Sequence, residues 1–393
     1  MSTPDTLTED VIDAWANDRN GPVALHLKQK LVPVEEGEHA MIFPPTYADI
    51  GYNIDTLADG TKVAMIDSVG SQANRIEPIF KEEPYSALVP QITIELRTEK
   101  NGDKEHRVVR SLLDFAHRGA DAVVMSCPGL AQKVAEAFRV LSQSNDAGPL
   151  CELAPTSLLF GVWDSRGGSG EKRPRLVRSV IRAWGVEPLY AAAQFNSVWK
   201  ALSDDQKAEL EKEAKAKKIK LSEKGFADAP AVFRKVSQSA AKSMSEFRNG
   251  SPNPERRVLG GVVVSGSIER DITINLTALR QIGGADTDST KQIRRYLLSL
   301  ALLAATVDFD LYLREGCQLR FAGEDQWFAV PRRGDRIPID LASEDAQKLL
   351  LSYAKNVVKP FQSKWPETLA YQFDIKEAKK LLAKKDEDEQ GEE

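Results

Sequence analysis

Residues 268–276 alternate between apolar and polar side chains. The apolar face holds Ile268, Ile272, Ile274 and Leu276, and the polar face holds Glu269, Asp271, Thr273 and Asn275. This period of two is typical of a β-strand with one face buried and the other in water. Such a strand needs neighbours in a sheet and a layer over its apolar face. The chain is therefore expected to build at least one half-covered sheet.

Helical and extended patterns alternate along the rest of the chain. The predicted helices are residues 128–141, 290–307 and 343–358, and the predicted strands include residues 62–68, 120–126, 157–163 and 258–265. Pro128 suits the first turn of its helix, and Ser343 suits an N-cap. We expect an α+β fold of the split βαβ type, that is, ferredoxin-like or RRM-like, with helical insertions and a projecting β-hairpin.

We predict a single domain over residues 1–385 that contains two insertions and is followed by a tail. Residues 97–110 surround Asn101-Gly102, a strong cue for a β-hairpin. Residues 195–250 form a predicted helical insertion that begins with a Lys-rich, solvated helix. Residues 386–393 contain six acidic and no basic residues, which predicts a disordered tail.

Composition excludes several classes of protein. The net charge is −5, but the part before the acidic tail sums to +1, so the position of the basic residues matters more than the total. The three cysteines form no C-x-x-C pair, which argues against a zinc site or a disulfide framework. The longest apolar run, residues 297–307, is too short to span a bilayer. We expect a cytoplasmic protein without a metal or a cofactor.

Residues 164–182 concentrate glycine and positive charge. The segment has six basic and two acidic residues, and Gly167, Gly168 and Gly170 let the backbone approach a ligand closely. Such a segment is suited to gripping a phosphate backbone without reading bases. It matches neither the P-loop nor the G-x-G-x-x-G pattern. Its second half favours a strand, with a helix as the alternative.

Two further segments carry polar side chains beside predicted strands. Residues 67–80 are suited either to sugar and phosphate contacts or to a helix N-terminus capped by Ser68 or Ser71, with Arg75 and Glu77 in solvent. His117 and Asp121 have helical spacing, but a loop histidine with local hydrogen bonds is the simpler interpretation.

These segments together resemble one known family. The strings are DSVGSQANR at 67–75, HRGAD at 117–121, and FGVWDSR at 160–166 running into PRLVRS at 174–179. In order and spacing they resemble the CRISPR RNA-binding backbone subunit of type I-G (formerly I-U) Cascade complexes, a member of the RAMP superfamily. With Gly260-Gly261, the resemblance extends from about residue 41 to residue 320.

The resemblance implies a hand-shaped subunit that polymerises along the CRISPR RNA in antiviral defence. Its palm would hold the RNA, a thumb hairpin would displace a guide base of a neighbouring copy, and the exposed guide would pair with target DNA. Residues 97–110 are the first candidate for the thumb, and the glycine-rich segment is the second. Implied partners are further copies, a fused processing and capping subunit, a large subunit and a helicase-nuclease.

The resemblance also implies which residues contact RNA. The RNA-binding candidates are Gln72, Asn74, Arg75, His117, Arg118, Arg166, Lys172, Arg173, Arg175, Arg178 and Arg182. We expect no catalytic residue. The alternative is a RAMP-type RNA endonuclease that uses Asp67, His117 or Asp164, but these residues form no coherent catalytic set in the sequence.

Overall fold

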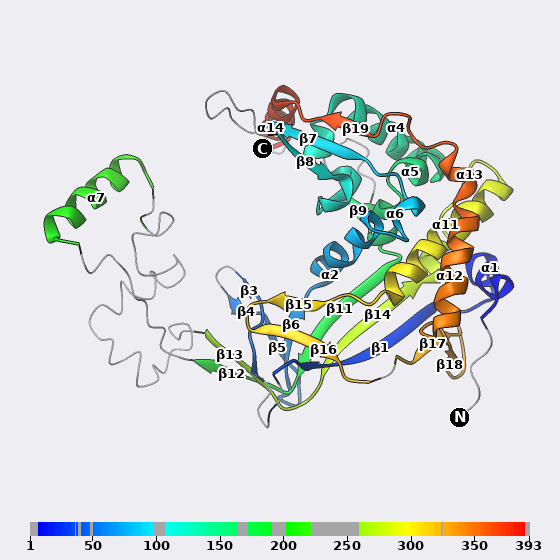
Figure 1. Cartoon of the computed structure of the whole chain (residues 1–393), viewed down its shortest axis with the longest axis horizontal. Coiled ribbons are helices and arrows are strands. Elements are labelled where there is room, and N and C mark those ends of the chain that lie inside the picture. The colour runs from blue at the N-terminus through cyan, green and yellow to red at the C-terminus, as the bar shows by residue number, and fades with distance from the viewer. Residues whose placement is uncertain are drawn as a thin grey trace.

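The computed structural model describes residues 7–35, 37, 41–47, 50–97, 107–163, 172–190, 202–219, 221, 259–323 and 325–389, without the side chains of residues 97, 190 and 383–389. The described part combines helices with a curled, antiparallel main sheet. Helices cover one face of this sheet (Figure 1). No helix among these residues is both long and apolar enough to cross a membrane.

The main sheet has nine strands in its described part. Seven of them lie in the order β15 (Leu311–Arg314), β16 (Cys317–Phe321), β1 (Ala24–Pro33), β14 (Ile268–Asn275), β11 (Val177–Trp184), β6 (Lys62–Asp67) and β5 (Ile54–Thr56). The other two strands are β17 (Trp327–Val330), which pairs with β1, and β18 (Ile337–Ile339), which pairs with β17. Every pairing is antiparallel. The alternation predicted for β14 is confirmed, because its buried and half-buried residues alternate throughout.

Four central strands lie in the order β17-β1-β14-β11. Since adjacent strands are antiparallel, β1 runs parallel to β11 with β14 between them, and β14 runs parallel to β17 with β1 between them. Helices occupy both connections, from β1 to β11 and from β14 to β17. Each connection thus places its helices on the covered face of the sheet (Figure 1).

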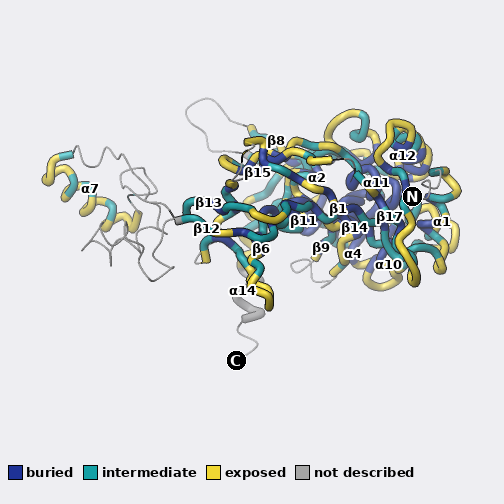
Figure 2. The backbone as a smooth tube through the Cα atoms, turned by 90° about the horizontal axis from the view of Figure 1, so that it is seen from below, coloured by how far each residue is buried: buried dark blue, intermediate teal, exposed yellow. Residues whose placement is uncertain are grey.

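The core lies between this sheet and the helical layer. The layer contains α1 (Glu9–Asn17), α2 (Val69–Ile76), α4 (Pro128–Ser144), α5 (Gly148–Leu153), α6 (Thr156–Phe160), α11 (Thr287–Thr306) and α12 (Glu344–Val357). The apolar run of α11 is buried through Ala305 and packs into one cluster with Leu27, Ile272 and Ile274 of the sheet. Figure 2 shows this buried centre in dark blue.

Smaller elements surround this core. They are β2 (Met41–Ile42), β3 (Thr46–Tyr47), β4 (Gly51–Tyr52), β12 (Val186–Tyr190), β13 (Leu259–Val264), β19 (Ala370–Gln372), α3 (Ala122–Met125), α10 (Leu276–Leu279), α13 (Lys359–Gln362) and α14 (Ile375–Glu389). In the predicted insertion, α7 (Asp204–Ala216) has no buried residue and lies apart from the core in both views (Figures 1 and 2). The remainder of residues 195–250, apart from a few near this helix, lies outside the described residues.

The predicted hairpin at residues 97–110 is confirmed in its two strands. β7 (Thr93–Arg97) and β8 (Arg107–Ser111) pair antiparallel, with Arg97 opposite Arg107. β19 pairs with β7 on its other side, which leaves β8 at the edge of this small sheet. Residues 98–106, including Asn101-Gly102, lie outside the described residues.

Two of the strands predicted from the sequence are wrong. Residues 120–126 and 157–163 were predicted as strands, but α3 and α6 occupy most of these segments, and only Val162–Trp163 is extended. A short apolar run that is buried on all sides has no period to separate a strand from a helix. In the predicted disordered tail, residues 386–389 continue α14, because extending a formed helix is far easier than nucleating one.

A buried polar network crosses the covered face of the main sheet. Arg270 of β14 is 1% exposed, and its Nε donates to Gln72 Oε1 at 3.1 Å and to Ser179 Oγ at 3.0 Å. Its Nη1 donates to Gln29 Oε1 at 3.2 Å, and its guanidinium lies 4.7 Å from the ring centroid of Phe309. These contacts offset the free energy of burying a charge inside the curled sheet.

We expect Arg270→Ala to lower the free energy of unfolding by about 3 kcal/mol or more, because it leaves buried polar groups without partners. Lys28→Ala is the control, since Lys28 on the adjacent strand is 52% exposed and pairs with Glu269 at 3.0 Å. That change should cost less than about 1 kcal/mol. Urea denaturation of both variants measures the difference, and equal losses would contradict the role assigned to Arg270.

Candidate nucleic-acid interface

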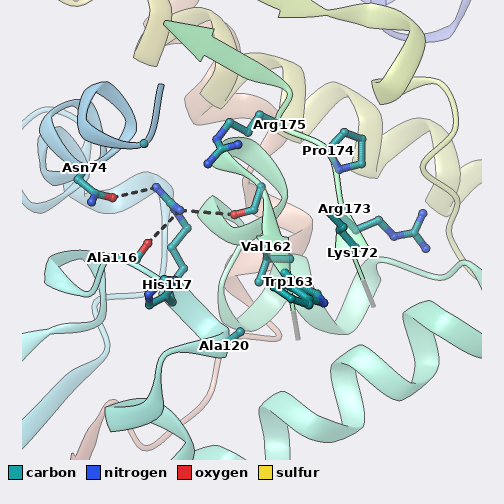
Figure 3. A pocket seen from close by; sticks show the side chains of 13 residues that line it. Asn74, Ala116, His117, Ala120, Val162, Trp163, Lys172, Arg173, Pro174 and Arg175 are labelled. Atoms are coloured by element: carbon teal, nitrogen blue, oxygen red, sulfur yellow. Dashed lines mark hydrogen bonds between the residues drawn. The ribbon is translucent and has the colours of Figure 1, made fainter. Parts of the chain in front are cut away.

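The three segments singled out in the sequence meet at one cavity of about 740 Å³. Its lining comprises Gly70, Asn74, Ala116, His117, Arg118, Ala120, Gly161, Val162, Trp163, Lys172, Arg173, Pro174 and Arg175. Figure 3 shows these side chains arriving from separate elements. Among the described residues, the cavity lining includes basic residues and no acidic ones. The spacing along the chain did not show that these segments converge.

The first segment enters the site through the turn from β6 to α2. The Ser68 side chain accepts a hydrogen bond from the Ser71 N–H at 3.2 Å and so caps α2. The polar residues that follow converge on the buried Asp67 carboxylate, to which Ser71 Oγ donates at 2.7 Å and Arg75 Nε at 3.0 Å. The predicted cap at Ser68 is therefore confirmed, and Asn74 at the end of this segment lines the cavity.

Gln72 is a correction to the predicted RNA contacts. Its side chain is 0% exposed, donates to Asp67 Oδ2 at 2.7 Å and accepts from Ser179 Oγ at 2.7 Å. It belongs to the buried network and cannot contact a strand at the surface. Arg75 is partly exposed, but its Nη2 donates to the Leu313 carbonyl at 2.7 Å, which links α2 to β15.

Arg118 joins the three segments. It is 4% exposed and pairs with Glu77 at 2.8 Å. Its remaining guanidinium nitrogens donate to Asn74 Oδ1 at 3.3 Å, to the Gly161 carbonyl at 3.4 Å and to the Ala116 carbonyl at 3.3 Å (Figure 3). Its φ of 55° is rare for a residue other than glycine, so this backbone turn is held by the surrounding contacts.

Glu77 is a buried partner that the sequence interpretation placed in solvent. Burial raises the pKa of its carboxyl from 4.5 to about 7, and the Arg118 charge opposes this shift. Burial likewise lowers the pKa of Arg118, and the nearby charge of Arg175 lowers it further. The i, i+2 spacing of Arg75 and Glu77 gave no sign of this burial, because the covering residues come from other segments.

The third segment forms a short hairpin, β9 (Val162–Trp163) with β10 (Lys172–Arg173). Gly161 before it has φ +82°, and a Cβ there would lie 2.8 Å from Cγ of Arg175, so glycine is required by both conformation and space. Lys172 and Arg175 are exposed, and Arg175 extends toward Asn74 (Figure 3). Arg173 Nη2 instead donates to the Leu141 carbonyl at 3.4 Å, near the end of α4.

Arg178 and Arg182 lie away from this cavity. The predicted strand is confirmed as β11, and Ser179 faces the buried network on the helix-covered side. Because side chains alternate along a strand, Arg178 and Arg182 point to the opposite face, where they stand in register with Thr273 and Glu269 of β14. Arg166 lies outside the described residues.

The residues considered for catalysis do not meet in the part of the chain that the structure describes. Asp67 is 1% exposed and surrounded by its own donors. His117 is exposed at the cavity, and its backbone N–H donates to Asp121 Oδ2 at 3.3 Å. Asp164 lies outside the described residues. Within these limits, no three His, Cys, Asp or Glu side chains group as metal ligands.

The Glu77 carboxyl predicts a measurable pH dependence. Its pKa is higher in the folded state than the ordinary 4.5, so the folded protein binds more protons than the unfolded chain between these values. The free energy of unfolding should therefore fall by up to about 3 kcal/mol as pH rises from about 5 to about 8. Glu77→Gln should remove this contribution to the pH dependence of the free energy of unfolding.

Urea denaturation across this pH range measures the slope for each variant. Glu136→Gln is the control, because Glu136 is an exposed partner of Arg139 on α4 and should leave the slope nearly unchanged. A slope in Glu77→Gln equal to that of the wild type would show that this carboxyl does not titrate as assigned.

Comparison with known proteins identifies the segment that carries this site. Residues 25–188 match the family model described as CRISPR-associated protein GSU0053 (Cas_GSU0053). The match spans β1 to β12 and includes every residue that lines the cavity. The comparison with curated proteins found no match. Residues 25–188, which are less than half of the chain, are therefore similar to a family of CRISPR-associated proteins.

Proposed function

We propose that this protein is the CRISPR RNA-binding backbone subunit of a type I-G Cascade complex. The observation that carries the proposal is the open cavity in which three distant segments bring Arg118, Lys172, Arg173 and Arg175 together, with no acidic residue among the described residues that line it. A cavity with this charge favours an anionic ligand. The family match supplies the CRISPR context for that ligand.

The arrangement of charge suits a phosphate. Arg118 and Arg175 are close enough for the charge of Arg175 to lower the pKa of Arg118, so their positive charges repel each other. A phosphate bound at the cavity would relieve this repulsion and accept charge-assisted hydrogen bonds from the exposed guanidinium of Arg175. Glu77 beneath Arg118 fixes the guanidinium in place but lies outside the lining. Contacts of this kind hold a backbone and leave sequence recognition to base pairing.

The fold supports a palm-and-thumb subunit. The order β17-β1-β14-β11, with helices in both connections, is that of the split βαβ arrangement found in RRM-like domains. This sheet and its helices would form the palm. The β7–β8 hairpin, in which β8 is the edge strand of a small sheet, is the candidate thumb. Copies of the protein would then repeat along the guide RNA.

The proposed complex assigns the remaining tasks to other molecules. The guide RNA pairs with target DNA, a fused subunit processes and caps the guide, a large subunit joins the assembly, and a helicase-nuclease is recruited. This chain contributes shape and charge and has no catalytic role in the proposal. Arg178 and Arg182 would contact nucleic acid from the outer face of the sheet, separately from the cavity.

We expect Lys172→Glu/Arg175→Glu to weaken binding of unrelated single-stranded RNAs to a similar degree. The slope of log affinity against log salt should fall by about 0.7 for each lost phosphate contact. Fluorescence anisotropy with labelled RNA measures both quantities. Arg139→Glu is the matched reversal on the surface of α4 and should change binding little.

A cleavage assay with the same proteins tests whether the chain has a catalytic role. Labelled RNA incubated with the protein, with and without magnesium, should remain intact on a denaturing gel. Cleavage that disappears in His117→Ala or Asp164→Ala would favour the RNA endonuclease instead. Wild-type affinity in Lys172→Glu/Arg175→Glu would remove the cavity from the RNA-binding surface.

A further inference from the structure

Trp163 is exposed at the edge of the cationic cavity. Its side chain is 62% exposed, whereas Trp15 and Trp327 are buried and Trp184 and Trp365 are half-buried. Trp163 is therefore the one exposed tryptophan in the described part of the chain. Leaving an indole in water forfeits the free energy that its burial would contribute. This position suggests that the ring is kept available for a ligand.

The backbone directs the Trp163 side chain outward. Val162, the preceding residue on β9, is 7% exposed and belongs to the main core cluster. Because adjacent side chains on a strand point to opposite faces, burial of Val162 directs Trp163 outward. Pairing of Trp163 with Lys172 on β10 and the left-handed turn at Gly161 fix the same orientation.

The surroundings of the ring combine a π-face with positive charge. Lys172 Nζ lies 5.8 Å from the Trp163 ring centroid, within the range of a cation–π contact. Figure 3 shows His117 across the cavity from Trp163, and Arg175 on the segment that follows β10. A single nucleotide could place its base on the indole while its phosphates reach these cations. A purely ionic ligand would make no use of the indole.

We infer that Trp163 is a stacking platform for one base of a single-stranded RNA bound in this cavity. The inference rests on the proposed function and adds a contact that the backbone charges do not supply. Stacking accepts every base, since each has a π-face, so the contact favours unpaired nucleotides without selecting a sequence. It also favours a strand that carries bases over a plain polyanion of equal charge.

Trp184 is the other tryptophan near a predicted RNA-binding surface, but it does not offer the same contact. It is half-buried, and its Nε1 is buried without a hydrogen-bond partner among the described residues. The structure favours Trp163 over Trp184 as the stacking residue.

The test compares labelled oligoadenosine with an abasic ribose-phosphate strand of the same length, using the full chain. Wild-type protein should bind the base-bearing strand about 10-fold more tightly, which is the usual scale of one base–aromatic contact. Trp163→Ala should lose most of this preference, and Trp163→Phe should retain much of it. The salt slope should be unchanged in both variants, because no phosphate contact is removed.

Two further measurements separate stacking from a loss of folding. RNA should quench tryptophan fluorescence in the wild type more than in Trp163→Phe, which lacks this indole. Urea denaturation should show nearly equal stability for the three proteins, since the ring is exposed. If Trp163→Ala is unstable, quenching of tryptophan fluorescence by RNA in the wild type and in Trp163→Phe still tests whether Trp163 stacks on a base.

The outcomes distinguish the two proposals. If wild-type protein binds neither strand, the proposed function fails. If it binds both strands with the expected salt dependence but without preference for bases, or if Trp163→Ala keeps that preference, the stacking inference is overturned and the RNA-binding function stands. Equal quenching in the wild type and Trp163→Phe would likewise overturn stacking at this residue.

Discussion

The buried ion pair between Arg118 and Glu77 is the interaction on which the candidate site depends. Arg118 reaches Asn74 on α2 and the carbonyl of Gly161 before β9, so one guanidinium connects the three segments that form the cavity. Glu77 supplies the charge that makes this burial tolerable, although burial still raises its pKa to about 7. Without a buried anion at this point, the unpaired guanidinium would strongly favour water.

A second set of buried charges shapes the sheet that carries this site. Arg270 of β14 and Asp67 of β6 both bond to the neutral Gln72 of α2, the helix that also presents Asn74. Arg75 and Arg314 tie β15 to α2 and β6 through the carbonyls of Leu313 and Ile66. The polar residues of the first motif therefore serve mainly to close the sheet, and only its exposed end faces the cavity.

The two faces of β11 separate the predicted RNA-binding residues into two groups. Arg175, which precedes the strand, lines the cavity on the helical side, whereas Arg178 and Arg182 lie on the outer face of the sheet. A binding protein built in this way has positive charge on both sides of one sheet. The cavity also has the exposed indole of Trp163, so it combines positive charge with an aromatic ring.

The sequence alone determined features that depend on neighbours along the chain. It identified the alternation of β14, the hairpin strands around Asn101-Gly102, the buried helix α11 and the cap at Ser343, because period, turn chemistry and capping are local. It also located the segments that form the cavity. Only the tertiary structure decided that Gln72 and Glu77 are buried and that Trp163 is exposed. Burial depends on which distant segments cover a side chain, and no local pattern contains that information.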